Sequence, residues 1–401
     1  MTTTPPHVGW AEADARRIHR QFLDEPAGTT PAEVTAAMLG AHAQILSAAE
    51  LSVALRTAKA TRADVRSALR GDRADGADRT NRTGRTDRTL IKTYGPRGTV
   101  HLLPTADLPL WTGALSSIPT GRSSMPADVR MTPAQTDEVV AAIADALTGA
   151  ELTVDELTDA IVARTGPWAG DRVMDAFQDK WPRWRQVTHT AAHRGVLCFG
   201  ADRGRKVTYT HPGVRPADGT AALGELVERY LHAYGPASPR HFAKWLAAPD
   251  RWAGELFAGL AGEGRIEEVS FEGESAWVVA GDTEFPDEPA RGVRLLPYFD
   301  AFTIASQPRE RLFPGEAYGR ALAGGQAGNF PVLLIDGTVA GVWHQRRSGK
   351  RIAVTVEPLP SAGTLGAARL RELAEQAERV GAVLEGTAEL TVGTVTVGPH
   401  A

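Results

Sequence analysis

The sequence predicts an α+β protein in which three tandem winged-helix motifs precede a C-terminal β-barrel-like domain. A chain of 401 residues is too long for one ordinary core, so it must divide into several units. The order of helices followed by two short strands occurs three times before residue 290, which indicates a repeated motif. After residue 291 the chain changes to short β-rich runs.

The first unit, residues 1–125, combines helical patterns with a strand-like run. The helical patterns cover 8–23, 31–47 and 62–69, and the strand-like run covers 90–103. Thr30, Pro31 and Glu33 form a good start for the second helix, with a cap, a proline at the first position and an acid three residues after the cap. A helical stretch over 35–56 is expected to carry the tripeptide His42-Ala43-Gln44.

The second and third units, residues 126–218 and 219–290, repeat this order. The second is expected to have helices at 133–147 and 153–165, a third helix near 181–195, and strands at 196–200 and 206–210. The third is expected to have helices at 221–234, 238–245 and 251–262, and strands at 266–271 and 275–279.

The C-terminal domain, residues 291–401, is predicted as a mixed, largely antiparallel sheet or small barrel. Its expected strands cover 293–297, 331–335, 338–345, 351–357 and 386–395, with an amphipathic helix over 364–380.

One segment, residues 71–89, is of low complexity, with recurring Arg-Thr pairs and no apolar residue beyond two alanines. We expect a disordered basic loop there. The sequence leaves open whether this loop contacts phosphates or is a solvated insertion.

The composition is that of a soluble globular protein, with 42% hydrophobic and 23% charged residues. No apolar run approaches the roughly 20 residues that span a bilayer, and the N-terminus has no secretory apolar region. The single cysteine, Cys198, excludes disulfides within the chain and cysteine-rich zinc sites. We therefore expect a cytoplasmic protein with no membrane partner.

The net charge of −4 hides a polarised distribution. Residues 56–97 carry 12 Lys/Arg and 5 Asp, and residues 180–206 carry 7 Lys/Arg and one Asp. Residues 253–290, by contrast, carry 10 Asp/Glu and one Arg. The two basic regions could line a track for phosphates, with the acidic region facing away from it.

Several kinds of chemistry find no support in the sequence. No phosphate-binding or dinucleotide-binding glycine motif lies at a strand–helix junction, so we expect no nucleotide cofactor. His189 and His193 have a spacing that could ligate zinc, but no glutamate lies between them. Packed or phosphate-facing histidines fit this segment better, and we expect no metal.

His42 and Gln44 are the polar residues that draw attention in the first unit. On a regular helix they would point about 200° apart, so both can meet one substrate only at a helix end, a bulge or the rim of a cleft. A lone His or Gln in an apolar stretch is usually structural. Spacing alone therefore leaves a catalytic and a structural role open.

The whole chain resembles the AlkZ/YcaQ family of winged-helix DNA glycosylases. The matching stretches, in the family's order, are Gly40-Ala41-His42-Ala43-Gln44, Thr93-Tyr94-Gly95-Pro96-Arg97-Gly98-Thr99-Val100-His101-Leu102, Arg294-Leu295-Leu296-Pro297-Tyr298-Phe299-Asp300 and Trp343-His344-Gln345-Arg346-Arg347. The family carries a Gln-x-Gln or Gln-x-Asp catalytic motif, and one branch has His-x-Gln, which this chain matches with His42 and Gln44. The role of Asp300 stays open, since it could cap a turn.

The resemblance implies a C-shaped enzyme around DNA that hydrolyses the N-glycosidic bond of bulky N7-alkylguanine adducts, formed by intercalating, DNA-alkylating natural products. Alkylation at N7 makes the base a good leaving group, so the enzyme need only deliver water and stabilise an oxocarbenium-like state. His42 and Gln44 could orient that water, and His42 could accept its proton. Lyase chemistry would need a well-placed lysine, and none of the six lysines lies in the motif, so we expect a monofunctional enzyme.

Eight residues are candidates for DNA contact. They are Arg97, Arg183, Arg185, His189, Arg346, Arg347, Lys350 and Arg351. The last four would lie at the tip of a hairpin that turns at Ser348-Gly349 and inserts toward phosphates or a groove. The alternative is a charged edge hairpin that prevents aggregation. For 181–194, the alternative to a recognition helix is a core tryptophan pair with solvated arginines.

The expected partner is double-stranded DNA carrying alkylpurine adducts, bound by a monomer with no obligate protein partner, near the nucleoid. The rival hypothesis is a non-enzymatic winged-helix regulator or architectural protein. That rival predicts sequence-selective binding, dimerisation and no effect of changing His42 or Gln44.

Overall fold

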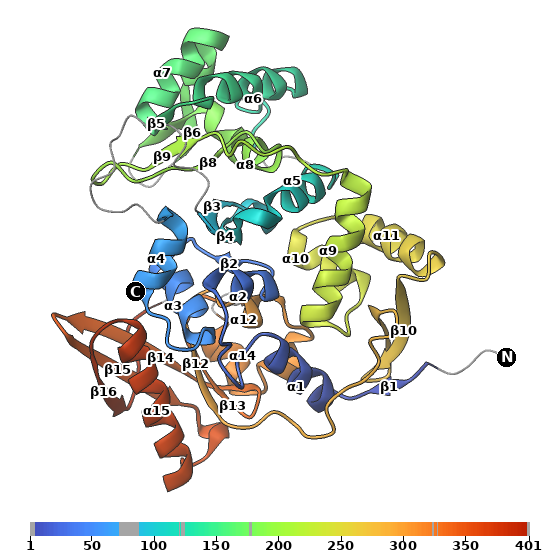
Figure 1. The fold of residues 1–401 in the computed structure, drawn as a ribbon, viewed down its shortest axis with the longest axis vertical. Coiled ribbons are helices and arrows are strands. Elements are labelled where there is room, and N and C mark those ends of the chain that lie inside the picture. Colours follow the sequence, from blue (N-terminus) through green and yellow to red (C-terminus); the bar gives the residue numbers. More distant parts are fainter. Residues whose placement is uncertain are drawn as a thin grey trace.

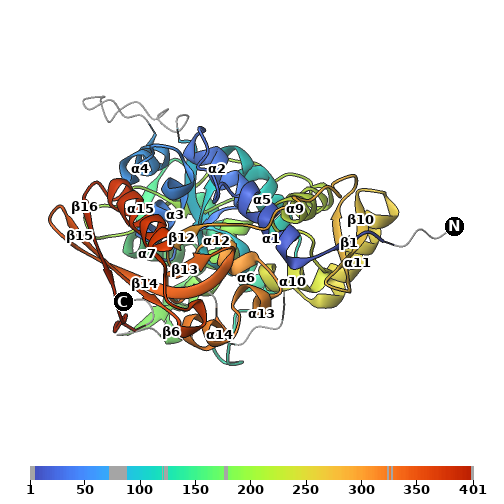
Figure 2. The same ribbon diagram turned by 90° about the horizontal axis from the view of Figure 1, so that it is seen from below.

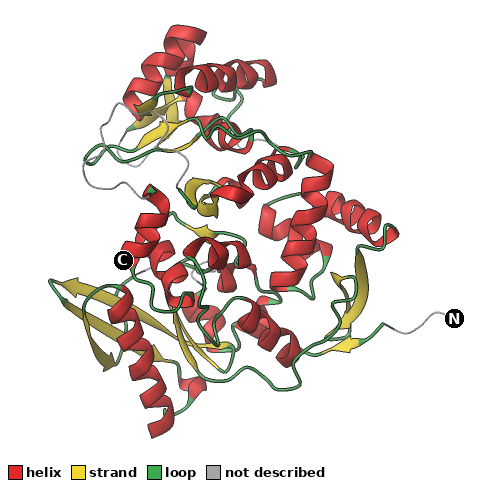
Figure 3. Ribbon diagram, viewed as in Figure 1, coloured by secondary structure: helices red, strands yellow, loops and turns green. Residues whose placement is uncertain are grey.

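Helices and short strands alternate along the whole chain, so the protein is of mixed α+β class (Figure 1; Figure 3). The computed structural model describes residues 5–71, 88–119, 121, 125–175, 179–322, 325–326 and 328–398. The basic loop expected at 71–89 lies almost entirely outside the described residues.

The first unit surrounds a small three-stranded sheet. Its helices are α1 (Trp10–Arg20), α2 (Pro31–Ala37), α3 (Leu46–Arg56), α4 (Arg62–Arg70) and α5 (Leu108–Ser116), and its strands, in sheet order, are β2 (Ala41–His42), β4 (Val100–Pro104) and β3 (Leu90–Tyr94). The expected start of α2 is confirmed, since the Glu33 N–H donates to Thr30 Oγ1 at 3.3 Å. Helix α5 was not expected; nearly all its residues are buried, so it shows no amphipathic period.

The continuous helical stretch expected over 35–56 is wrong. Helix α2 ends at Ala37, and Gly40 adopts a φ of +92°, a conformation that glycine tolerates and that a helix cannot contain. The chain then forms β2, in which His42 pairs with His101 of β4. The Ala43 N–H continues this pairing by donating to Val100 O at 2.7 Å. His42 therefore lies on extended backbone.

The second unit lies at the top of Figure 1. It contains α6 (Pro133–Leu147), α7 (Val154–Thr165) and α8 (Thr188–His193), a sheet in the order β5 (Glu151–Thr153), β9 (Thr208–Thr210), β8 (Cys198–Phe199), and a ribbon of β6 (Arg172–Asp175) and β7 (Lys180–Pro182). Its α8 and β8 pack against the first unit.

The recognition helix expected near 181–195 is not one helix. The segment forms β7, a 3₁₀ helix η4 (Arg183–Val187) and the short α8. Pro182 disfavours helical backbone at Trp181, which explains the extended start. Trp184 is fully buried and its Nε1–H donates to Thr158 Oγ1 at 3.0 Å, which anchors η4 against α7.

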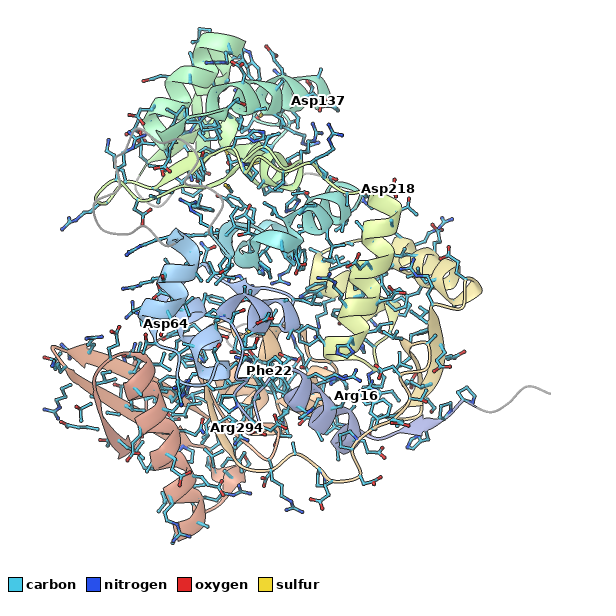
Figure 4. All side chains as sticks on the ribbon, viewed as in Figure 1. Arg16, Phe22, Asp64, Asp137, Asp218 and Arg294 are labelled. Carbon is cyan, nitrogen blue, oxygen red and sulfur yellow. The ribbon has the colours of Figure 1, made fainter. Side chains whose placement is uncertain are left out.

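The third unit follows the predicted order closely. Its helices are α9 (Gly219–Tyr234), α10 (Pro239–Leu246) and α11 (Asp250–Gly262), and its sheet has the order β1 (His7–Val8), β10 (Ile266–Phe271), β11 (Glu274–Val279). Strand β1 pairs parallel to β10, although residue 8 was expected to begin a helix. The acidic segment, residues 253–290, also makes ion pairs within the protein. Its Asp282 pairs with Arg20 at 2.5 Å and with Arg16, labelled in Figure 4, at 3.5 Å.

The C-terminal region is an open sheet in its described part. Its strands have the order β12 (Val293–Leu296), β13 (Val332–Ile335), β14 (Thr338–Ser348), β15 (Arg351–Pro358), β16 (Thr387–Val392), with α12 (Ala301–Ala305), α13 (Arg309–Leu312), α14 (Glu316–Ala321) and α15 (Ala367–Val383). No pairing joins the edge strands β12 and β16 among the described residues, so the sheet does not close into a barrel there. Helix α15 packs on the sheet beside β12 and β16 and shares its buried core (Figure 2).

None of the helices described is both long enough and apolar enough to span a membrane.

Candidate active site

A pocket of about 320 Å³ lies beside His42, where the first unit, the third unit and the C-terminal region meet. Its lining residues are His42, Arg97, Thr99, His241, Lys244, Trp245, Phe299, Ile304, Ala305, Gln307, Arg309 and Gln326. They come from β2, from the turn between β3 and β4, from α10, from the segment around α12 and α13 and, for Gln326, from the chain after α14. The fold thus gathers residues far apart in the sequence around the histidine of the His-x-Gln motif.

His42 is held by ring contacts. Its imidazole stacks on Phe299 with centroids 4.5 Å apart and meets the ring of His101 edge-on at 5.1 Å. The side chain is 8% exposed, and its Nδ1 has no hydrogen-bond partner among the described residues. Burial, together with the positive charge of Arg97, lowers the pKa of His42 to about 3. The imidazole is therefore neutral at physiological pH, and no described residue uses the hydrogen-bonding capacity of its Nδ1.

The turn between β3 and β4 positions His101 behind His42. The ring Nδ1–H of His101 donates to Thr99 O at 2.9 Å, and burial holds the pKa of His101 well below its ordinary value. Gly95 leaves room for this ring, since a Cβ at that position would lie 2.9 Å from His101 Cγ. Packing against His101 therefore explains why glycine occupies position 95 in the Thr93–Leu102 stretch.

Arg97 lies in the same turn, within η1 (Pro96–Gly98), and reaches the pocket wall. Its guanidinium donates to Trp245 O, at the end of α10, over 2.6 Å. Burial, and secondly the charge of Arg309, lowers the pKa of Arg97 to about 10. The side chain expected to contact DNA is thus part of the pocket beside His42.

Lys244 and Arg309 also line the pocket, and sequence reasoning missed both. Burial and the charge of Arg309 lower the pKa of Lys244, whereas Glu310 acts in the opposite direction. None of the lysines belongs to the motif in the sequence, but α10 brings Lys244 to the same pocket as His42. No spacing pattern in the sequence links these cations to His42, so only the fold reveals them.

Gln44 lies two residues beyond His42 and is exposed, at a bend before α3, and it does not line the pocket. Neither residue lies in a helix, so the opposed directions expected for helical spacing do not apply; the structure places His42 in the pocket wall and Gln44 on the exposed bend.

The hairpin of β14 and β15 is confirmed, with Ser348 paired to Arg351 and the turn at Gly349-Lys350, one residue later than expected. Arg347 donates to Leu384 O at 2.6 Å, and Arg351 forms an ion pair with Glu389 at 2.5 Å. Arg346 and Lys350 are exposed. None of these four residues lines the pocket, and the hairpin lies at the left edge of Figure 1.

The residues of the second unit that were predicted to contact DNA also make contacts within the protein. Arg183 donates to Val129 O at 2.6 Å, and Arg185 lies over the exposed ring of Trp181, 4.2 Å from its centroid. His189 packs against the Gly98 backbone and burial lowers its pKa. Acids also offset the basic region 180–206: Asp137, labelled in Figure 4, pairs with Arg194 at 2.7 Å.

Asp300, whose role the sequence left open, joins Arg56 and Ser52 and caps a helix. Its carboxylate accepts two hydrogen bonds from Arg56, at 2.7 and 2.8 Å, and one from Ser52 at 2.7 Å. It also caps α12 through the Phe302 N–H at 3.0 Å. Both Arg56 and Asp300 are completely buried.

No group of three or more His, Cys, Asp or Glu side chains suited to a metal ion occurs within the described ranges. His193 instead donates from Nε2 to Gly95 O at 3.1 Å, which ties α8 to the turn behind the pocket.

Comparison with known proteins gives consistent results over most of the chain. The family model described as DNA glycosylase AlkZ-like matches residues 35–383. A curated protein of Streptomyces sahachiroi, the interstrand DNA cross-link repair glycosylase, is 30% identical in an alignment 361 positions long that covers 84% of this chain and 88% of that protein. The solved structure of the Streptomyces sahachiroi DNA glycosylase AlkZ is similar with a TM-score of 0.77 and 27% identity, covering 96% of this chain and 100% of that one.

Proposed function

Because this chain belongs to the AlkZ-like family of DNA glycosylases, we propose that it hydrolyses the N-glycosidic bond of bulky N7-alkylguanine adducts, with His42 and Gln44 positioning the water. The observation that carries this proposal is the neutral imidazole of His42 in the wall of the pocket, with no hydrogen bond to the described residues. A neutral imidazole can accept a hydrogen bond from a water molecule without repelling a cationic transition state.

The proposed mechanism depends on how readily the alkylated guanine leaves. A guanine alkylated at N7 already carries positive charge, so its departure needs no strong acid. The sugar becomes oxocarbenium-like, and water then attacks C1′. With its pKa lowered to about 3, His42 orients this water and is only a weak proton acceptor before DNA binds. The lowered pKa weakens the expectation that His42 accepts the proton of this water, and it suits a reaction in which bond breaking precedes attack.

Gln44 is proposed to act from the DNA side of His42. Its exposed amide can donate to and accept from a water molecule held between protein and sugar. Its place only two residues from His42 in the chain supports a joint role.

DNA binding is proposed to use the three helical units as winged helices and the β14–β15 hairpin as a further contact. Each unit has helices next to a three-stranded sheet, which supports this assignment. Arg346 and Lys350 are the hairpin cations best placed to meet phosphates, because Arg347 and Arg351 have partners within the protein. The expected substrate is double-stranded DNA bound by a monomer near the nucleoid.

The proposed role is self-resistance or repair against DNA-alkylating, intercalating natural products. The name of the Streptomyces sahachiroi relative concerns interstrand cross-links, which makes such cross-links a second substrate to test.

Excision from N7-alkylguanine duplexes tests this proposal. Abasic product is scored on denaturing gels after alkaline cleavage, with wild-type protein, His42→Ala and Gln44→Ala. We expect both variants to bind the duplex and to lose excision. Excision that neither substitution affects would remove the motif from the mechanism, and the absence of abasic product with wild type would refute the substrate.

A further inference from the structure

We propose that the pocket beside His42 receives a backbone phosphate of the DNA next to the damaged nucleotide, and not the alkylated base. This inference rests on the proposed function, since it concerns how the same site holds its substrate. It assigns a ligand class to the pocket and gives roles to Lys244 and Arg309 that the sequence did not suggest.

The charge of the pocket wall carries the inference. Arg97, Lys244 and Arg309 all line the pocket, and no Asp or Glu is among its described lining residues. The three cations are close enough to interact, because Arg309 lowers the pKa values of both Arg97 and Lys244. The printed hydrogen bonds of Arg97 and Arg309 go to main-chain carbonyls and not to carboxylates. Such a group of cations is stable only where an anion or water compensates it.

A cationic base does not suit this wall. The N7-alkylated guanine carries a positive charge, and moving it into a partly enclosed space between three cations is electrostatically unfavourable. A phosphodiester carries one negative charge and accepts several hydrogen bonds, which matches the donors present. The charge that repels the base therefore attracts the backbone beside it.

Two of the three cationic side chains are held in place by hydrogen bonds to main-chain carbonyls. Arg97 is anchored by its hydrogen bond to Trp245 O, and Arg309 by one to Gly325 O at 3.0 Å. Arg309 Nε is buried without a partner among the described residues. Lys244 is the exposed member on α10, so it can move to meet an anion. Two anchored guanidinium groups and one mobile ammonium form a preorganised phosphate site.

A phosphate in this position would leave the sugar of the damaged nucleotide next to His42. It would also lie close to Lys244 and favour the charged form of that amine, which suppresses attack on C1′. The pocket then explains how an enzyme with a lysine at its active site can act by hydrolysis alone.

Substitution of single phosphates tests the inference. Duplexes carry a tetrahydrofuran abasic analogue, with one methylphosphonate placed in turn at each phosphate around it, and their affinities are measured by fluorescence anisotropy at fixed salt. For wild type we expect a loss of about tenfold at one or two adjacent positions and smaller losses elsewhere.

The double variant Lys244→Ala/Arg309→Ala should bind the unmodified duplex more weakly and show no further loss at those positions. Arg251→Ala is the matched control, since Arg251 is an exposed arginine whose partner is Glu255 on its own helix, and it should retain the wild-type profile. Uniform losses at all positions, a double variant as sensitive as wild type, or no binding of this duplex would each overturn the inference. Because the duplex contains no glycosidic bond to break at the abasic analogue, failure of excision would leave this result standing, and the two proposals can fail separately.

Discussion

The ring of Phe299 stacks on the imidazole of His42, with centroids 4.5 Å apart and planes 24° from parallel. Phe299 adopts a φ of +53°, which is unusual for an aromatic residue, and the next residue is the buried Asp300. The bidentate pair of Arg56 and Asp300 therefore fixes the backbone on which the His42 contact depends. A buried ion pair and the proposed water-positioning histidine form one connected unit.

Breaking this pair should destabilise the protein. Arg56→Ala leaves the carboxylate of Asp300 buried and uncompensated, so the free energy of unfolding should fall by about 3–5 kcal/mol. Urea unfolding followed by circular dichroism measures it. The exposed Arg346→Ala is the control and should change stability little. A loss for Arg56→Ala as small as that of the control would contradict a structural role for the pair.

Replacing Phe299 should affect excision more than stability. Phe299→Leu keeps an apolar side chain but removes the ring that orients His42, so the excision rate should fall by about three- to tenfold, in line with the worth of an aromatic contact. Phe285→Leu, which loses a ring over Arg16 instead, is the matched control. Equal rates for wild type and Phe299→Leu would show that the stacking does not position His42.

The pH dependence of excision should lack a histidine inflection. Burial and Arg97 lower the pKa of His42 to about 3, so the imidazole is neutral above that pH and becomes charged only as the pH falls toward 3. The single-turnover rate should therefore be flat from about pH 5.5 to about pH 8, because a group that titrates far below this range does not change its charge within it. A rate that falls below pH 6.5 in wild type, and does not fall in His42→Ala, would contradict the lowered pKa in the DNA complex.

The periodic helices could be predicted because their signals are local. Helices α4, α6, α7 and α11 begin and end within a few residues of the predicted limits, since caps and amphipathic spacing define them. The helical context of His42 could not be predicted correctly. Strand β2 has two residues and exists because it pairs with β4, some sixty positions later in the chain. Such short strands depend on their partner and leave no periodic signal.

The site could be predicted only in part, because most of its residues are brought together by packing and not by a local sequence signal. The family phrases contain His42, Arg97, His101 and Phe299, but only the first two were assigned a role. Lys244 and Arg309 belong to α10 and α13, and their nearness to His42 follows from packing among three regions of the chain. The assigned roles of the hairpin and second-unit cations stay predictions, although partners within the protein already engage Arg183, Arg347 and Arg351.

Asp14 should make stability depend on pH. Burial raises its pKa from 3.8 to about 7, so the folded protein binds its proton more tightly than the unfolded chain does. The free energy of unfolding should accordingly fall as pH rises from about 4 to 7, by up to about 4 kcal/mol for three pKa units. Asp14→Asn removes this loss, so the variant should gain on wild type between pH 5 and pH 8 in urea titrations. A difference that stays constant or narrows with rising pH would refute the raised pKa.

The reaction should leave no covalent link between protein and DNA. If the phosphate site keeps Lys244 charged, borohydride added during excision should trap no lysine–sugar adduct on denaturing gels. A bifunctional glycosylase with a known lysine nucleophile serves as the positive control. A trapped species that disappears in Lys244→Ala would show that Lys244 reacts with C1′ and that the enzyme is not monofunctional.

The central claim, that His42 in the pocket wall positions the attacking water, is tested most directly by single-turnover excision from an N7-alkylguanine duplex with enzyme in excess. Wild type and His42→Ala are compared, and their affinities for the tetrahydrofuran duplex are measured alongside. The account predicts that the rate falls by about 100-fold or more while the affinity stays within about twofold. A His42→Ala protein that excises at the wild-type rate would contradict it.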